Sequence, residues 1–325
     1  MKDYFFVSDI HGRNLKLEIE LKKIAQDKES KPKIIFFLGD IVGTEKLDKL
    51  QKLFYNGIVN HVRKLLIEKP DATDIEILSL PIGDNKIVAD GGQEIQEFLF
   101  GKTNIDVANN IKYIRELAQY VHFGHFVSNL PKEIKAVLQK DMEDNAKIWI
   151  DIMTQFTNQG TNVVIIEGNW DARTPLDFYP TTECKPLPIK ERGFYLKDFL
   201  KSLNDKVRYF DQVGTIETEN EIFVLWPFDS AVEATMVPEF DENQETKKII
   251  LVSHAQIDWS SVNGDKPMTN EGRKIQDNMP MTFDDVKADT AVHGHLHDSI
   301  GTDGYLFKQK FIHYLPKDTC RFIDF

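Results

Sequence analysis

Residues 4–11 read YFFVSDIH, an apolar run, Tyr4–Val7, followed at once by Asp9 and His11. A short run of β-branched and aromatic residues predicts a buried strand. The two polar side chains follow at the point where such a strand ends. In open α/β sheets, ligands bind outside the carboxyl ends of the strands, so we expect this edge of the sheet to carry a site.

The same arrangement recurs along the chain. Further apolar runs predict strands at Ile34–Leu38, Val163–Ile166, Ile222–Leu225, Ile249–Val252, Ala291–Val292 and Lys310–Leu315. Four of them lead into polar clusters, which are Gly39-Asp40, Gly168-Asn169, Ser253-His254 and His293-Gly294-His295-Leu296-His297. Because the ends of neighbouring parallel strands meet at one edge, the clusters are expected to converge.

Converging carboxylate and imidazole groups are the ligand types that a pair of divalent metal ions requires. Each motif alone is weak, but the order D-x-H, G-D, G-N-x-D, S-H and G-H-x-H is specific. This order resembles the calcineurin-like metallophosphoesterase superfamily. The resemblance covers the residues around these motifs and does not extend to the segment between the second and third motifs.

The resemblance implies a four-layer α-β-β-α sandwich of two mixed sheets, an α/β fold with the metals at one edge. It implies hydrolysis by in-line attack of a metal-activated hydroxide on phosphorus. The expected metal ligands are Asp9, His11 and His297 for one ion, Asn169, His254 and His295 for the other, with Asp40 bridging both. The residues expected to act in catalysis are Asp40, Asn169, Asp171 and Arg173, the last as an electrostatic stabiliser.

Mixed His, Asp and Asn ligation suits Mn²⁺, Fe and Zn²⁺ alike, and we expect Mn²⁺ first. His293 precedes the glycine of its motif and has no ligand role in the pattern, so packing or a hydrogen bond to a ligand is expected for it.

The third motif departs from the family pattern, because Trp170 stands where most members carry a catalytic histidine. An indole N–H cannot protonate a leaving oxygen at neutral pH. Three interpretations stay open. In the first, the protein is similar to family branches, mostly small prokaryotic phosphodiesterases, that replace this histidine. In the second, a donor comes from elsewhere, from His122, His125, Arg173 or metal-bound water. In the third, catalysis is lost and the fold serves protein interaction.

The segment 46–145 differs in character from the rest. Leucine, isoleucine and valine recur at helical spacing over 47–66 and 105–121, and Pro131 opens a further predicted helix that leads back into the core. We interpret 46–145 as a mostly helical insertion and 1–45 with 146–325 as the core. The insertion could act as a lid or as a dimerisation surface.

The composition of the chain limits the kinds of substrate, metal site and location that we expect. With 40 Lys and Arg against 52 Asp and Glu, the net charge is -12, which disfavours nucleic acid as the substrate. Cys184 and Cys320 form no thiolate metal motif, no apolar run is long enough to span a membrane, and no signal peptide is expected before Tyr4. We expect a cytoplasmic protein that acts on a small phosphorylated, nucleotide-like substrate.

Two functions from different classes remain. The first is a metal-dependent phosphoesterase, with diesters favoured over monoesters because the usual acid is absent. The second is a non-catalytic interaction scaffold on the same fold.

Overall fold

The computed structural model has helices and strands at both ends of the chain and in its centre. The structure describes residues 3–27, 31–47, 67–69, 81–82, 85–86, 132–172, 196–200, 203, 205–228, 240, 246–254, 287–294, 304–307 and 310–325.

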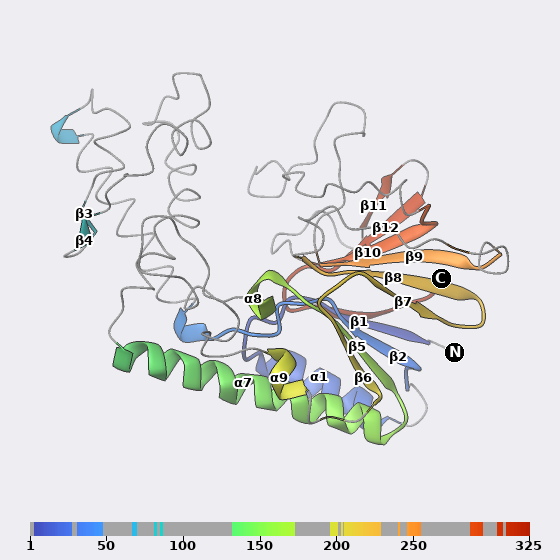
Figure 1. The fold of residues 1–325 in the computed structure, drawn as a ribbon, viewed down its shortest axis with the longest axis horizontal. Coiled ribbons are helices and arrows are strands. Elements are labelled where there is room, and N and C mark those ends of the chain that lie inside the picture. The colour runs from blue at the N-terminus through green and yellow to red at the C-terminus, as the bar shows by residue number, and fades with distance from the viewer. Residues whose placement is uncertain are drawn as a thin grey trace. The chain divides into compact units, whose positions relative to one another are not determined.

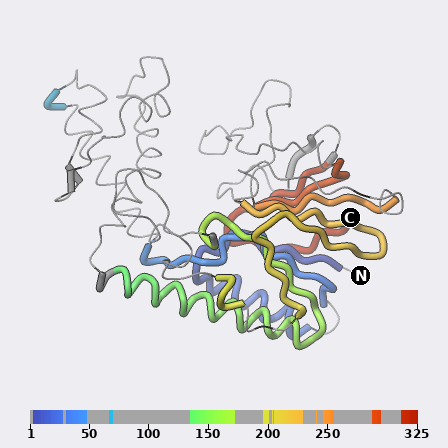
Figure 2. Tube along the Cα trace, in the orientation of Figure 1, coloured from blue at the N-terminus to red at the C-terminus, as the bar shows by residue number. Residues whose placement is uncertain are grey.

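One mixed sheet has five strands in the order β13-β1-β2-β5-β6. The central strands run parallel, and β13 pairs antiparallel with β1. The first and last strands of the chain therefore lie side by side, with Tyr4 opposite Ile323 (Figure 2). The bounds are β1 Tyr4–Val7, β2 Ile34–Phe37, β5 Asn162–Ile166, β6 Val207–Phe210 and β13 Cys320–Ile323.

The second mixed sheet has six strands in the order β11-β12-β10-β9-β8-β7. Its four inner strands are parallel, and β7 and β11 close the two edges with antiparallel pairing. The bounds are β7 Gly214–Glu217, β8 Glu221–Trp226, β9 Lys248–Ser253, β10 Thr290–His293, β11 Gly304–Phe307 and β12 Lys310–Tyr314. The chain thus has the predicted α/β class, with two mixed sheets.

All the apolar runs that predicted strands form strands, within one or two residues at each end. In these two sheets, β6, β7, β11 and β13 were not predicted from the sequence. Of these, β6 and β13 form the two edges of the five-stranded sheet and are only partly buried. Their sequences, VRYF and CRFI, mix charged and apolar residues, so no continuous apolar run marks them.

The two sheets share one hydrophobic core, which includes residues from the inner strands of both. Phe223 on β8 lies against Tyr4 and Phe36 of the other sheet, with ring centroids 4.9 Å and 4.8 Å away. Phe6 stacks on Phe36 within the five-stranded sheet. Each sheet therefore buries one of its faces against the other sheet.

Helices α1 (Leu15–Gln26), α9 (Leu196–Leu200) and the part of α7 (Lys132–Asn158) from Met142 onward lie along the five-stranded sheet (Figure 1). Helix α1 begins at an N-cap, since the Asn14 side chain accepts a hydrogen bond from the backbone of Leu17 at 3.0 Å. Helix α7 buries a stripe at helical spacing, comprising Met142, Ala146, Trp149, Ile152, Met153 and Phe156. The helix predicted from Pro131 is therefore confirmed.

The chain divides into two compact units, one made of 1–43, 142–172 and 195–325 and the other of 44–141 and 173–194. The boundaries predicted from the sequence were 46 and 145, with 173–194 in the core. Apart from Leu47, the helices predicted at 47–66 and 105–121 lie outside the described residues. Within that second unit, the structure describes a two-stranded pair, β3 (Pro81–Ile82) and β4 (Asn85–Lys86).

Among the described helices, none combines the length and the apolar character needed to cross a membrane.

Candidate metal centre

Five of the predicted ligands lie in the described part of the chain, and each follows a strand. Asp9 and His11 come after β1, Asp40 comes after β2, and His254 comes after β9. Asn169 is the first residue of the short helix α8 (Asn169–Ala172), which follows β5. Strands β1, β2 and β5 are parallel neighbours, so three of these clusters meet at one sheet edge.

The Asp40 carboxylate lies between two imidazole rings. Its Oδ2 is 3.2 Å from Nε2 of His11 and 3.4 Å from Nε2 of His254. Its Oδ1 accepts a hydrogen bond from the backbone N–H of Trp170 at 2.8 Å. One oxygen of Asp40 therefore faces both histidines, which is the arrangement that a bridging carboxylate needs.

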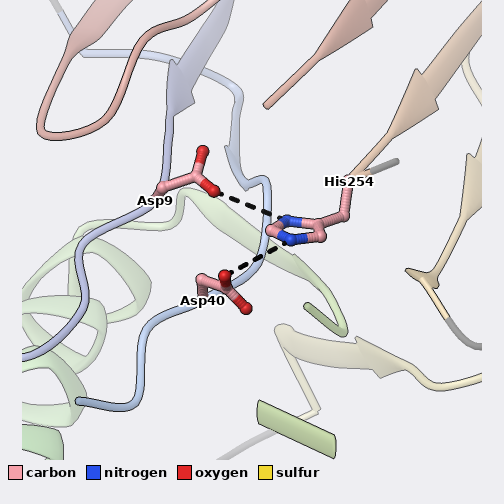
Figure 3. Close-up of side chains that lie close together, drawn as sticks. All are labelled: Asp9, Asp40 and His254. Carbon is pink, nitrogen blue, oxygen red and sulfur yellow. Dashed lines mark ion pairs between the residues drawn. The ribbon is translucent and has the colours of Figure 1, made fainter. Parts of the chain in front are cut away.

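The His254 ring is held from both sides. Nδ1 lies 2.6 Å from the carbonyl oxygen of Leu38 and 3.9 Å from Oδ1 of Asp9 (Figure 3). Nε2 lies 3.0 Å from Oδ1 of Asn169, in addition to its approach to Asp40. The ligand-type atoms of Asp9, Asp40 and His254 all lie within 4.8 Å of one another, and all three residues are buried.

These contacts determine which nitrogen of the His254 ring carries a hydrogen. The Leu38 carbonyl can only accept a hydrogen bond, so Nδ1 carries a hydrogen. In the neutral ring, the lone pair of Nε2 then points toward oxygen atoms of Asn169 and Asp40, which also carry lone pairs. A proton on Nε2, a metal ion, or the amide N–H of a turned-over Asn169 side chain satisfies this lone pair, and the first two also offset the charge of Asp40.

The charges of this cluster are tightly linked. Burial by itself raises the pKa of Asp40, but the neighbouring His254 and His11 outweigh it and hold that pKa below its usual range. Burial lowers the pKa of His254, and the charges of Asp40 and Asp9 reverse this effect and raise the pKa to about 9. Without a metal ion, the cluster therefore balances its buried carboxylates with a proton on His254.

The backbone around the cluster adopts a rarely populated conformation. His11 and Asp40 have positive φ angles of 50° and 52°, and Gly12 and Gly39 have 105° and 94°. For side-chain-bearing residues this region costs about 1 to 2 kcal/mol each. Such strain gathers at sites where side chains must be aimed, and here it affects two of the predicted ligands.

Two glycines make room for the carboxylates. A Cβ on Gly168 would lie 2.2 Å from Oδ1 of Asp40, and a Cβ on Gly294 would lie 2.6 Å from Oδ2 of Asp9. Gly168 directly precedes the predicted ligand Asn169, and Gly294 directly precedes the predicted ligand His295. Their lack of a side chain lets the strand ends approach closely.

Asp171 is buried, and its carboxylate accepts hydrogen bonds from three backbone N–H groups. Oδ1 accepts from Ile41 at 2.9 Å and Val42 at 3.0 Å, and Oδ2 accepts from Gly168 at 3.1 Å. Burial and the neighbouring charge of Asp40 raise the pKa of Asp171 to about 7. These contacts tie the loop after β2 to the loop after β5. That Asp171 acts in catalysis stays a prediction.

Two further positioning residues come from α7 and were not singled out from the sequence. Nε1 of Trp149 donates a hydrogen bond to the carbonyl of Gly12 at 2.5 Å, and Nδ2 of Asn145 donates to the carbonyl of Gly43 at 3.1 Å. No local sequence pattern reveals which carbonyl the N–H of Trp149 meets.

His293 packs in the core, as predicted. It is fully buried at the end of β10, its ring lies 5.1 Å from that of Tyr314, and Nδ1 is 3.2 Å from the carbonyl of Gly294. Burial lowers the pKa of His293 to about 4. The ring is therefore neutral at physiological pH.

The remaining predicted residues lie outside the described part of the chain. They are the ligands His295 and His297, the stabiliser Arg173, and the candidate proton donors His122 and His125.

Comparison with known protein families and with curated proteins finds no match to this chain.

Proposed function

We propose that this cluster belongs to a binuclear divalent-metal centre and that the protein hydrolyses phosphoric esters, with diesters favoured over monoesters. The observation that carries the proposal is the position of Asp40, whose Oδ2 lies 3.2 Å from His11 and 3.4 Å from His254. A single carboxylate oxygen between two imidazole nitrogens suits a ligand shared by two ions.

The donor set fits such ions in both chemistry and spacing. Donors bound at about 2.1 Å in adjacent positions of one ion lie about 3 Å apart. The separations around Nε2 of His254, 3.0 Å to Asn169 and 3.4 Å to Asp40, match that spacing. Asn169, His254 and Asp40 would hold one ion and Asp9, His11 and Asp40 the other, with His295 and His297 completing the proposed set.

A bound pair of divalent ions supplies positive charge for the phosphoryl oxygens and lowers the pKa of water. The chain's own residues then orient the donors. The Leu38 carbonyl fixes the His254 ring with Nε2 toward Asp40, and the Trp170 N–H holds the other Asp40 oxygen. Asp171 keeps the loops that carry Asp40 and Asn169 together.

The proposal extends to the fold, to the metal and to the substrate. The two sheets share a core, and helices lie along the five-stranded sheet, which accounts for three layers of the proposed four-layer α-β-β-α sandwich. We propose Mn²⁺ as the metal, with Fe and Zn²⁺ as alternatives. The substrate is a small phosphorylated, nucleotide-like molecule in the cytoplasm, consistent with a net charge of -12 that disfavours nucleic acid. Homo-oligomers could form through 46–145.

The test measures hydrolysis of bis-p-nitrophenyl phosphate after reconstitution with Mn²⁺, for the wild type, Asp40→Asn and Asp3→Asn. Asp3 precedes β1, at the end of the strand opposite to Asp9, and pairs with Lys33 at 2.7 Å. Asp3→Asn is therefore the matched control. We expect Asp40→Asn to lower kcat by about 10²-fold or more, the scale of losing one charge-stabilising group, and Asp3→Asn to retain activity. Equal rates for the wild type and Asp40→Asn would contradict the proposal.

The alternative function is a non-catalytic interaction scaffold, and Trp170 favours it because an indole cannot serve as an acid. Elemental analysis of bound metal distinguishes this scaffold from the enzyme. Two metal ions per wild-type chain, and fewer in Asp40→Asn, support the enzyme. Absence of bound metal after reconstitution supports the scaffold.

A further inference from the structure

Ser8 directly precedes the predicted ligand Asp9 and is fully buried where β1 ends. Its hydroxyl lies against Oδ2 of Asp9 and 2.8 Å from the carbonyl oxygen of Leu315. Leu315 follows β12 in the six-stranded sheet, whereas Ser8 follows β1 in the five-stranded sheet. One hydroxyl group therefore contacts a predicted metal ligand and the backbone beside the other sheet.

The loop 315–319, which connects β12 to β13, adds backbone contacts to the same two residues. The N–H of Ser8 donates to the carbonyl of Thr319 at 3.0 Å, and the N–H of Asp318 donates to the carbonyl of Asp9 at 3.0 Å. Asp318 has a φ of 61°, a left-handed conformation that is unfavourable for residues other than glycine. The loop therefore holds the backbone of Asp9, while Ser8 contacts its side chain.

The Ser8 contact restricts how the Asp9 carboxylate can turn. Ser8 contacts Oδ2, and Oδ1 lies 3.9 Å from Nδ1 of His254 (Figure 3). A hydroxyl carries one hydrogen, and an ionised carboxylate accepts a stronger hydrogen bond than a backbone carbonyl does. Asp9 therefore takes the larger share of this hydrogen. Gly294 leaves room for the pair, because a Cβ there would lie 2.6 Å from Oδ2 of Asp9 and 2.9 Å from Oγ of Ser8.

We propose that Ser8, held by the loop 315–319, is a positioning residue for Asp9 and sets the affinity of the ion that Asp9 would bind. This role rests on the metal centre proposed above. A hydrogen bond to a ligating carboxylate orients it, and removing such a partner weakens metal binding by about 10- to 100-fold. The hydroxyl of Ser8 therefore contributes more to the ion on the Asp9 side than to the ion on the Asn169 side.

The test is calorimetric titration of the metal-free full chain with Mn²⁺, for the wild type, Ser8→Ala and Thr161→Val. Thr161 is the matched control, because it is also fully buried and its hydroxyl donates to a backbone carbonyl, that of Pro32, at 2.8 Å. It precedes β5, at the end of the sheet opposite to Asp9.

We expect Ser8→Ala to raise the Kd of one Mn²⁺ ion by about 10- to 100-fold and Thr161→Val to leave both Kd values unchanged. Unchanged Kd values in folded Ser8→Ala would overturn the inference. An equal rise in Thr161→Val would also overturn it, because the loss of any buried hydroxyl would then explain the effect.

A double-mutant cycle tests whether Ser8 acts through Asp9. The same titration is made for Asp9→Asn and for Asp9→Asn combined with Ser8→Ala. We expect Ser8→Ala to raise Kd by a smaller factor in the Asp9→Asn background than in the wild type, because the effects of two residues that act as one unit do not add. The same factor in both backgrounds would show that Ser8 acts independently of Asp9.

Hydrogen exchange of the wild type needs no variant, so it decides the matter if Ser8→Ala does not fold or Asp9→Asn binds no metal. Mn²⁺ should slow exchange at the Asp318 amide more than at the Glu221 amide. The Glu221 N–H donates to Oγ1 of Thr218 at 3.0 Å, at the start of β8 and away from the candidate centre. Equal slowing at both amides would overturn the inference.

These outcomes differ from those that decide the proposed function. If the wild-type chain binds no Mn²⁺, the proposed function and the role of Ser8 both fail. If the wild type binds two ions and folded Ser8→Ala binds them equally well, only the role of Ser8 fails.

Discussion

Gly168 lies where any side chain would occupy the same space as Asp40. A Cβ at this position would be 2.2 Å from Oδ1 and 2.3 Å from the backbone nitrogen of Asp40. Because Asp40 already has a positive φ of 52° and is buried, it has little freedom to move away. At the scale of single residues, the candidate centre therefore depends on a missing side chain as much as on the ligands that are present.

We expect Gly168→Ala to weaken metal binding sharply and to lower the free energy of unfolding by about 1 to 3 kcal/mol, as overpacking does. Gly160→Ala is the matched control. Gly160 has a φ of 88°, so alanine there is strained too, but the nearest atom is Nζ of Lys31 at 3.3 Å. Calorimetric titration with Mn²⁺ and thermal unfolding compare the two variants. If both bind Mn²⁺ as tightly as the wild type, Gly168 does not protect the position of Asp40.

At the scale of elements, helix α7 supports the loops that follow β1 and β2. Trp149 and Asn145 lie on α7 and donate to the carbonyls of Gly12 and Gly43, which belong to those loops. The first loop contains His11 and the second begins after Asp40. The helix therefore stabilises the strained backbone conformation that aims the two side chains at one another.

Trp149→Phe removes the hydrogen bond to Gly12 and should destabilise the protein by about 1 kcal/mol more than Trp226→Phe, because a buried carbonyl loses its donor. The two residues form a matched pair. Both are fully buried, but Nε1 of Trp226 has no hydrogen-bond partner among the described residues. Denaturant unfolding measures the difference, and Mn²⁺ titration should show weaker binding only in Trp149→Phe. Equal losses in both variants would contradict this role of Trp149.

At the scale of the whole molecule, the described sheets form one packed core. Phe223 joins them, since it is fully buried on β8 and its ring contacts those of Tyr4, Phe36 and Phe325, which lie on or beside the other sheet. The described candidate ligands come from both sheets, with His254 after β9 and Asp9, His11, Asp40 and Asn169 after strands of the five-stranded sheet. Loosening the contact between the sheets should therefore affect stability and the metal centre together.

Phe223→Ala should cost about 3 to 5 kcal/mol of unfolding free energy, the usual cost of deleting a buried aromatic ring. Phe311→Ala serves as the control, because Phe311 is 40% exposed, and its loss should stay within about 0.5 kcal/mol. Urea unfolding followed by tryptophan fluorescence reports the change, since Trp226 is buried on the same strand. Similar midpoints for the two variants would show that the sheets do not depend on Phe223.

The sequence by itself determined the α/β class, the strands that carry the candidate ligands, and the expectation that these ligands converge. The reason is local, because an apolar run followed by Asp, Asn or His is visible within a few residues. The partly buried edge strands β6 and β13 have no such run and were missed.

Only the tertiary structure decided how the candidate ligands are held. The Leu38 carbonyl that orients His254 lies 216 positions away in the chain, and the backbone groups that Asp171 binds after β2 lie 130 and 129 positions away. Backbone donors and acceptors are the same at every position, so no residue type marks which of them a side chain will meet. Packing of the strands and helices makes that choice, and with it the geometry around Asp40.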